Sequence, residues 1–222
     1  LAAALLLAAA ACTDRAEGSG AARADSPSPP PAPSAAAPSD EIPWRANPAD
    51  DVRLAPDGDS VVVESGPHTI VWERGGEELS PPYTVTARLR KESGRLHEGI
   101  GILFGGTGLE GPESGQVYSY FLVRGDGTFL IKRRQGAETP VVRDWTTHAA
   151  VRRDADDGGR PNDLEVRVGE TEAVFLVNGA EVARVPAADL SVRGRAGVRV
   201  SHDVRLVVSG FRVTHGAPAG AP

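Results

Sequence analysis

Short apolar runs that alternate with polar positions dominate the chain from about Glu41 onward. In the stretch PYTVTARLRK, the apolar residues Tyr83, Val85, Ala87 and Leu89 alternate with threonine and arginine. A period of two places successive side chains on opposite faces of a strand. The pattern therefore predicts a strand with one buried face and one hydrated face.

Similar segments recur along the rest of the chain. We expect strands at 60–65, 68–73, 82–91, 99–106, 117–124, 128–134, 164–168, 172–177, 180–185, 194–200 and 204–213. Asn178 and Gly179 form the pair that favours a type I′ turn, which predicts a tight hairpin. The one helical candidate is a single turn near 187–190. About eleven to thirteen strands with short turns need two sheets to bury their apolar faces, so we expect an all-β jelly-roll sandwich.

The N-terminal region has a different composition. Residues 1–12 read LAAALLLAAAAC, and Cys12 is the single cysteine of the chain. This run is shorter than the roughly 20 residues that a membrane span requires, but it fits the apolar region of a partial secretory signal peptide. The small residues before Cys12 resemble the lipobox of bacterial lipoproteins, although that motif usually has leucine at the position of Ala9. The resemblance implies cleavage before Cys12 and a diacylglyceryl thioether on its sulfur.

The remaining boundaries follow from composition. Residues 13–42 are rich in Pro, Ala and Ser and contain few bulky apolar side chains, so we expect a disordered linker. The β-sandwich is expected at 43–215, and the Ala, Gly and Pro tail at 216–222 is again expected to be disordered. Lipidated Cys12 would hold the domain to a lipid bilayer at the extracytoplasmic face of the cell membrane or outer membrane.

Charge narrows the classes of partner. The formal net charge is -6 and the sequence pI is about 5.4. Binding to nucleic acid depends on a basic footprint, and none is visible in the sequence, so we expect no nucleic-acid partner.

The second half of the chain resembles a known superfamily. The segments are YSYFLVRGDGTFLIKRR, then Trp145, then NDLEVRVGETEAVFLVNGAEVARV, and finally GRAGVRVSHDVRLVVSGFRV. Together with the strand at Tyr83 they look like the concanavalin A-like lectin and glucanase superfamily, closest to its laminin-G-like and three-keto-disaccharide-hydrolase-type domains. The resemblance covers about 83–213 and implies a jelly-roll fold, which hosts sugar binders, glycoside hydrolases and adhesion modules alike.

We find no catalytic residues in the sequence. The glucanase branch uses paired carboxylates in a Glu-x-Asp-x-x-Glu arrangement, and this motif is absent. Glu165 lies between Leu164 and Val166, which are expected to face the core, so its carboxylate should point to solvent. The enzyme question therefore stays open, with the balance towards a non-catalytic protein.

The best candidate for ligand binding is a set of aromatic and polar residues. Tyr118 and Tyr120 share one face of a strand, next to the strand that carries Arg133. With His97 or Glu98 they could form a surface on which a sugar ring stacks. The alternative is that both tyrosines belong to the core, because large aromatic side chains are usually buried.

Calcium is the one cofactor that the sequence leaves open. The loop at 152–163 contains Asp154, Asp156 and Asp157, whose carboxylates are the hard ligands that calcium prefers. The same residue types are also common in any exposed turn, which is the alternative interpretation.

The sequence leaves three candidate functions open. The first is a lipid-anchored envelope protein whose domain binds carbohydrate or another envelope component without catalysis. The second is a glycoside or three-keto-disaccharide hydrolase-type enzyme. The third is a protein-adhesion or structural module.

The lipid anchor gives the first prediction. Cys12→Ser removes the sulfur that would carry the lipid, so the protein should move from the detergent phase to the aqueous phase in a detergent phase-separation assay. Thr13→Ala, at the neighbouring position, should leave the partitioning unchanged. Unchanged partitioning of Cys12→Ser would refute the anchor.

Overall fold

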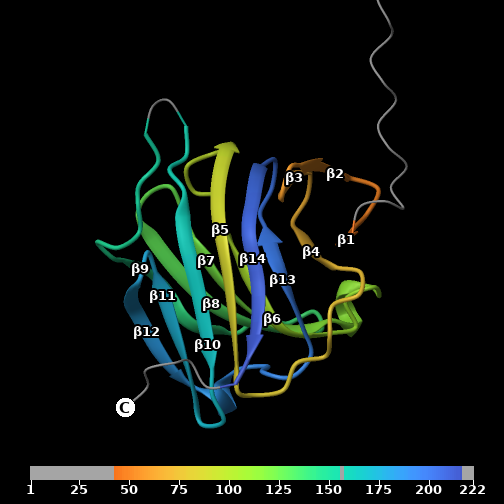
Figure 1. Ribbon diagram of the computed structural model, residues 1–222, viewed down its shortest axis with the longest axis vertical. Helices are drawn as coiled ribbons and strands as arrows, with labels where there is room; N and C mark the ends of the chain where they lie inside the picture. The colour runs from red at the N-terminus through yellow and green to blue at the C-terminus, as the bar shows by residue number, and fades with distance from the viewer. Residues whose placement is uncertain (1–42, 156–157, 217–222) are drawn as a thin grey trace, which may run out of the picture. The chain divides into compact units, whose positions relative to one another are not determined.

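The computed structural model describes residues 43–155 and 158–216. The signal segment 1–12, the linker 13–42 and most of the tail 216–222 lie outside these residues. Within them, two antiparallel seven-stranded sheets pack face to face, which confirms the predicted jelly-roll sandwich (Figure 1). The order of strands is β1-β4-β13-β6-β7-β8-β9 in sheet A and β12-β11-β10-β5-β14-β3-β2 in sheet B.

The strands have the following bounds. Sheet A contains β1 (Trp44–Asn47), β4 (Thr69–Glu73), β6 (Ile100–Thr107), β7 (Val117–Val123), β8 (Thr128–Gln135), β9 (Val141–Thr147) and β13 (Arg195–Val200). Sheet B contains β2 (Val52–Asp57), β3 (Ser60–Ser65), β5 (Tyr83–Ser93), β10 (Asn162–Val168), β11 (Glu172–Val177), β12 (Ala180–Pro186) and β14 (Arg205–His215). Two short 3₁₀ turns are η1 (Glu113–Gly115) and η2 (Ala187–Asp189), the second at the predicted helical turn.

The three strands that the sequence pattern did not indicate all lie at sheet edges. β1 and β9 form the two edges of sheet A, and β2 forms one edge of sheet B. Their side chains are exposed or half-buried, without the regular in-and-out alternation of the inner strands. Strands that bury little apolar area carry a weak periodic signal, which is why these three were missed.

The core between the sheets is built from alternate residues of the inner strands. On β5, Tyr83, Val85, Ala87 and Leu89 are at most 3% exposed, as the period of two predicted. Phe175 on β11 in sheet B packs against the rings of two phenylalanines from sheet A, with centroids 5.2 Å and 6.0 Å away. The two sheets are therefore joined by an aromatic cluster at their centre.

The predicted hairpin between β11 and β12 is confirmed. Asn178 and Gly179 have φ values of 50° and 82°, which is the left-handed backbone that a type I′ turn requires. The side chain of Asn178 also holds two neighbouring segments, because its Nδ2 donates to the Ala150 carbonyl at 2.7 Å and its Oδ1 accepts from the Asp163 amide at 3.0 Å. The described residues contain no helix of sufficient length and apolarity to cross a bilayer.

The aromatic core gives the second prediction. Phe175→Ala removes a ring that is 0% exposed and leaves a cavity between the sheets, so the free energy of unfolding should fall by about 3 to 5 kcal/mol. Leu96→Ala truncates a side chain that is 54% exposed and should cost about 0.5 kcal/mol or less. Chemical denaturation of both variants measures the difference, and equal losses would contradict the packing described here.

Candidate functional site

Sheet A buries side chains on its outer face as well as on the face that meets sheet B. A second apolar cluster forms on this outer face and is separate from the main core. Its buried members are Ile70, Trp72, Leu103, Leu109, Tyr118, Tyr120, Leu122 and Leu130, with the half-buried Trp145 packed against them. A sheet face that is open to water ordinarily carries polar side chains, so this cluster marks the outer face of sheet A as unusual.

The connection between β6 and β7 covers one end of this face. It brings Leu109, which is 1% exposed, into the cluster. The Nδ2 atom of Asn47, on the edge strand β1, donates to the carbonyls of Leu109 and Gly111 at 2.6 Å and 2.7 Å. Gln116 donates to the same Gly111 carbonyl at 3.0 Å. These bonds hold the connection against the sheet.

Tyr118 and Tyr120 lie on this outer face, on alternate positions of β7. Their ring centroids are 5.7 Å apart, so the prediction that they share a face is confirmed. The two side chains are nevertheless only 1% and 5% exposed. The alternative reading of buried aromatics therefore also holds, because the rings belong to a second core and offer little free surface for stacking.

Arginine side chains lie over the rings of this face. The guanidinium carbon of Arg134 is 5.8 Å from the ring centroid of Tyr118, and that of Arg199 is 5.4 Å from the ring centroid of Tyr120. Arg124 lies over Trp145 at 3.5 Å. Such contacts stabilise a cation on an aromatic ring, most of all where water is excluded. The face therefore presents nitrogen donors above its aromatic rings.

The hairpin of β7 and β8 decides which cations join the tyrosines. Arg134 pairs with Tyr118 and Lys132 pairs with Tyr120, whereas Arg133 pairs with Ser119 and lies on the opposite face. Arg133 donates from Nε to the hydroxyl of Ser191 at 3.2 Å. The structure thus separates Arg133 from the tyrosines and places its two neighbours beside them.

We name this set of residues the Arg–aromatic surface. It consists of Trp72, Tyr118, Tyr120 and Trp145 together with Arg124, Lys132, Arg134 and Arg199. Three of its cations, Arg124, Lys132 and Arg199, have no carboxylate within 4.0 Å in the part of the chain that the structure describes. Arg134 approaches the exposed carboxylate of Glu113 at 3.4 Å.

Burial leaves several donors of the surface without a protein acceptor. The indole Nε1 of Trp72 and the Nε atoms of Arg124 and Arg134 are buried and have no hydrogen-bond partner among the described residues. The hydrogen bond from the guanidinium of Arg199 to the Thr69 carbonyl is long, at 3.4 Å. A buried donor without an acceptor costs about 1 to 3 kcal/mol, so these three atoms lower the stability of the surface as it stands among the described residues.

Burial and neighbouring charges on this surface disfavour the positively charged form of Lys132. Burial lowers the pKa of Lys132, and the neighbouring charges of Arg199 and Arg134 lower it further. Burial raises the pKa of Tyr120, and Arg199 partly opposes this effect. The shift of Lys132 has the sign expected of cations crowded together in a partly desolvated place, whereas the shift of Tyr120 reflects its burial and is reduced by the neighbouring cations.

The other two residues predicted for the site, His97 and Glu98, lie in the connection between β5 and β6. Glu98 is 5% exposed, and its carboxylate accepts a hydrogen bond from Arg95 at 2.9 Å. Although burial acts to raise it, the pKa of Glu98 is lowered because of that bond and the charge of Arg95. Gly99 follows directly, and Leu103 is the partner of Tyr120, so Glu98 lies roughly 17 Å along the strand direction from the tyrosine. The structure does not bring His97 and Glu98 together with the tyrosines.

A pair of stacked histidines borders the same end of sheet A. The rings of His68 and His202 have centroids 3.7 Å apart, and the backbone amide of His202 donates to Glu98 at 3.3 Å. Burial lowers the pKa of His68 to about 4, with smaller effects in the same direction from Arg199 and His202. The sequence pattern did not indicate this pair, because the two residues lie in different connections.

In its described part, the predicted calcium loop contributes an ion pair that stabilises the fold. The carboxylate of Asp154 lies 2.8 Å from Nζ of Lys91, and both side chains are largely buried. Asp156 and Asp157 lie outside the described residues. In 43–155 and 158–216, no group of three or more His, Cys, Asp or Glu side chains is arranged to hold a metal ion. Of the three predicted ligands the structure therefore describes Asp154 alone, which is paired with Lys91, and the calcium site stays a prediction.

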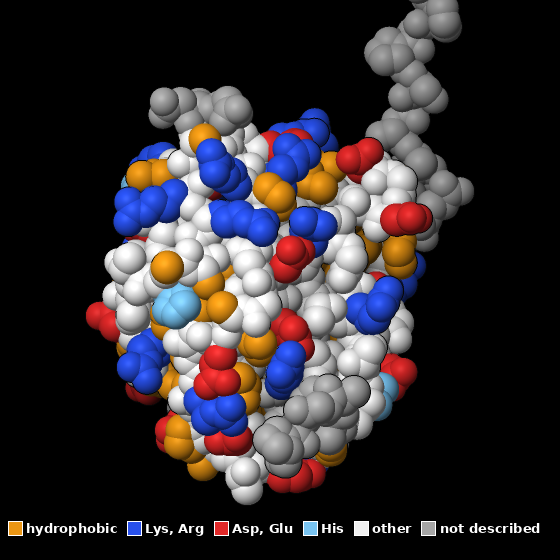
Figure 2. Space-filling model, turned by 60° about the vertical axis from the view of Figure 1, so that its left-hand side comes forward, with side chains coloured by type: hydrophobic (Ala, Val, Ile, Leu, Met, Phe, Trp, Pro, Cys, Tyr) orange, Lys and Arg blue, Asp and Glu red, His pale blue; other side chains and the backbone are white. Residues whose placement is uncertain are grey.

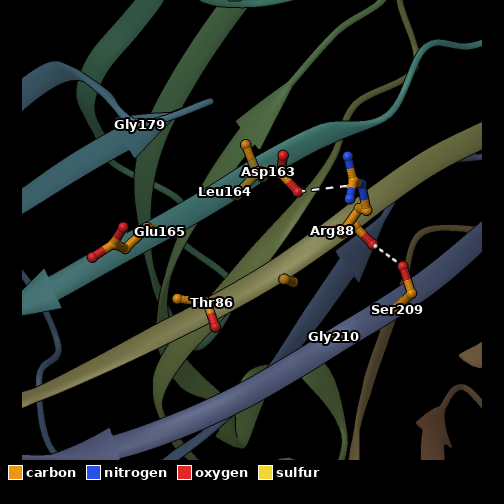
Figure 3. A pocket seen from close by; sticks show the side chains of 9 residues that line it. Thr86, Arg88, Asp163, Leu164, Glu165, Gly179, Ser209 and Gly210 are labelled. Carbon is orange, nitrogen blue, oxygen red and sulfur yellow. Dashed lines mark hydrogen bonds and ion pairs between the residues drawn. The ribbon is translucent and has the colours of Figure 1, made fainter. Parts of the chain in front are cut away.

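A shallow hollow of about 410 Å³ lies on the outer face of sheet B (Figure 3). Gly179 and Gly210 line it, and the lack of side chains at these positions leaves it open. Its charges are matched in pairs, since Asp163 lies 3.3 Å from Arg88 and Glu165 lies 2.6 Å from Arg167.

The two acids of this hollow are on the outer face of β10, so the expectation that Glu165 points away from the core is confirmed. Each is held by an arginine, so neither is a free carboxylate of the kind that glycoside hydrolysis requires. The described hollow therefore resembles a solvated ion-pair surface more than a catalytic cleft.

Comparison with known proteins shows a fold and no family. No family model and no curated protein matches the chain. Among solved structures, it is similar to the carbohydrate-binding module CBM66 from Bacillus subtilis, with a TM-score of 0.60, 10% identity, and 77% of this chain and 94% of that chain covered.

Two further solved structures are also similar to this chain in fold. A protein of unknown function with a galectin-like fold from Bacillus subtilis gives a TM-score of 0.55 at 14% identity, covering 78% of this chain and 90% of that chain. The carbohydrate recognition domain of Emp47p gives 0.54 at 14% identity, covering 83% and 92%. At these identities the likeness concerns the fold alone, which is the jelly-roll sandwich that the sequence resemblance implied.

The histidine pair gives the third prediction. Because the folded-state pKa of His68 lies near 4 instead of its ordinary 6.5, the unfolded chain binds more protons between these values. The stabilising contribution of neutral His68 to the free energy of unfolding should be fully present above pH 6.5 and should be lost as the pH drops towards 4. The outer edge of His68 is exposed, so solvent screening keeps the loss modest.

Chemical denaturation at pH 7 and pH 5 measures this loss, and His68→Gln should reduce the difference between the two conditions. An NMR titration of His68 provides the direct control. A midpoint at its ordinary value of 6.5 would contradict the burial beside Arg199.

Proposed function

We propose that the described domain is a carbohydrate-binding module, held by a lipid on Cys12 at the extracytoplasmic face of the cell membrane or outer membrane. The observation that carries the proposal is the Arg–aromatic surface. It gathers unpartnered donors and aromatic side chains on the outer face of sheet A. The lectin-type fold supports it, because two of the similar structures are named for carbohydrate binding or recognition.

Recognition of a sugar requires donors that are fixed in place before the ligand arrives. Arg134 and Arg199 are 6% and 7% exposed, and each is held over a tyrosine ring. Side chains that are already ordered lose little conformational entropy on binding. Their N–H groups can then donate to hydroxyl or ring oxygens of a saccharide, while Trp145 supplies half-buried aromatic area at the edge of the sheet.

The linker and anchor place this module at a distance from a membrane. Residues 26–34 read SPSPPPAPS, and such proline-rich sequences favour an extended chain of about 3.1 Å per residue. A domain on such a tether could reach glycans beyond the lipid surface. The anchor itself is the subject of the Cys12→Ser experiment.

A binding assay gives the fourth prediction. The full chain should bind at least one member of a broad glycan panel, and Trp145→Ala should weaken that binding by about tenfold, because it removes the ring and frees Arg124 from its fixed position. Glycan-array binding followed by titration calorimetry measures both effects, with thermal unfolding to confirm that the variant is folded.

Arg88→Gln is the matched control, since Arg88 lies in the hollow of sheet B (Figure 3). It should bind the same glycan as the unaltered chain does. Failure of the chain to bind any glycan of the panel would overturn the proposed function. Loss of binding in Arg88→Gln alone would move the site to sheet B.

A further inference from the structure

We propose that the Arg–aromatic surface selects saccharides that carry negative charge, as carboxylate or sulfate groups. This inference rests on the proposed function and specifies its ligand class. It follows from a contrast between two buried places: at the end of β5 a lysine is paired with a carboxylate, whereas on the outer face of sheet A three of four neighbouring cations have no carboxylate within 4.0 Å among the described residues.

The two lysines of the chain show the contrast directly. Lys91 is 4% exposed, and its Nζ lies 2.8 Å from the carboxylate of Asp154. Lys132 is half-buried and has no carboxylate within 4.0 Å in the described residues; its Nζ donates to the neutral hydroxyl of Thr139 at 3.1 Å. A buried charge is stabilised chiefly by an opposite charge, and Lys132 lacks one.

Other described arginines follow the pattern of Lys91. Arg184 lies against Glu172 and Glu181, and Arg205 lies against Glu64 and Glu92. In the space-filling view, basic and acidic side chains likewise lie next to each other over the lower part of the molecule (Figure 2). Pairing is thus common on this protein, also for Arg134 and Arg195 of sheet A. Among the described residues of the Arg–aromatic surface, Arg124, Lys132 and Arg199 depart from it.

The register of sheet A brings these cations to one place. A row across the sheet runs from Trp72 through Gly197 and Leu103 to Tyr120 and Lys132. Neighbouring strands are about 4.8 Å apart, so the last two side chains are direct neighbours.

Arg199 and Arg134 approach the same row from either side. Arg199 is paired with Gly101 on β6, and its guanidinium carbon lies 5.4 Å from the ring centroid of Tyr120. Arg134 is two residues from Lys132 along β8, on the same face. Three cations therefore surround one tyrosine, which is a geometry suited to a single anionic group.

The unsatisfied donors point to the same ligand chemistry. Nε1 of Trp72 and Nε of Arg134 are buried without an acceptor in the described residues. A carboxylate or sulfate offers several acceptor oxygens and forms charge-assisted bonds, which are roughly twice as strong as neutral ones. The lowered pKa of Lys132 agrees, because it reflects burial and repulsion from Arg199 and Arg134 that a bound anion would relieve.

The net charge of the chain argues against a non-specific electrostatic attraction of anionic saccharides to the whole protein. At -6, the protein as a whole repels anions, so preference for a charged saccharide must come from a local arrangement of cations. A saccharide is favoured over a free inorganic anion because the surface also buries aromatic and aliphatic area beside the cations.

The test uses matched pairs of probes on the full chain. Tetragalacturonate is compared with its methyl ester, and a sulfated chondroitin oligosaccharide with its desulfated form, because each pair differs chiefly in charge. We expect the charged member of at least one pair to bind about tenfold more tightly, which corresponds to about 1.4 kcal/mol. Raising the salt concentration should reduce this preference.

Lys132→Gln and Arg133→Gln form the variant pair. Both remove one positive charge from the same strand, but Lys132 faces Tyr120 and Arg133 faces the other side. Lys132→Gln should weaken binding of the charged probe about tenfold and leave that of neutral glycans nearly unchanged. Arg133→Gln should change neither by more than about twofold, because long-range effects of one charge are screened.

The possible outcomes distinguish the preference for charged saccharides from the proposed function. Equal or tighter binding of the neutral probes, with Trp145→Ala still weakening it, would overturn the preference for charge and leave the proposed function standing. Equal losses in Lys132→Gln and Arg133→Gln would also overturn the preference at this surface. Absence of binding to any saccharide, charged or neutral, would overturn the proposed function itself.

Discussion

Sheet A must bury apolar and aromatic side chains on both of its faces, and the rest of the structure depends on how the outer face is covered. One face packs against sheet B through the aromatic core around Phe175. No third layer of the described residues covers the other face. It is closed at one end by the connection that carries Leu109, and elsewhere by the long side chains of arginines that lie over the rings.

This way of covering the face has an electrostatic consequence. Arginine can lie flat on an aromatic ring and shield it from water, but at Arg124 and Arg199 it brings a charge with no carboxylate within 4.0 Å among residues 43–155 and 158–216. The same side chains that complete the second core therefore leave a cluster of cations and unsatisfied donors. Stability and ligand binding are linked here, because the groups that close the face are also the groups that an acceptor would contact.

Much of the fold could be predicted from the sequence, and the site only in part. Alternation identified the inner strands and the Asn178–Gly179 turn, whereas the edge strands β1, β2 and β9 bury too little to show a period. The spacing of Tyr118 and Tyr120 is enough to predict that they share a face. The length of the turn before β8 also sets the register of the β7–β8 hairpin, and this register places Lys132 and Arg134, instead of Arg133, beside the tyrosines. Trp72 and Arg199 could not be found this way, because they reach the site through the order β4-β13-β6-β7, and pairing between strands distant in sequence leaves no local pattern.

We propose above that a saccharide binds the outer face of sheet A. The most direct measurement is a nitrogen–proton NMR titration with the glycan that binds most tightly, following the Nε1 signals of Trp72 and Trp145 and the Nε signal of Arg199. We expect these signals to shift together and saturate, while the amide signals of Gly179 and Ser209, in the hollow of sheet B, stay in place. Saturating shifts at Gly179 and Ser209, with the tryptophan and arginine signals unmoved, would contradict it.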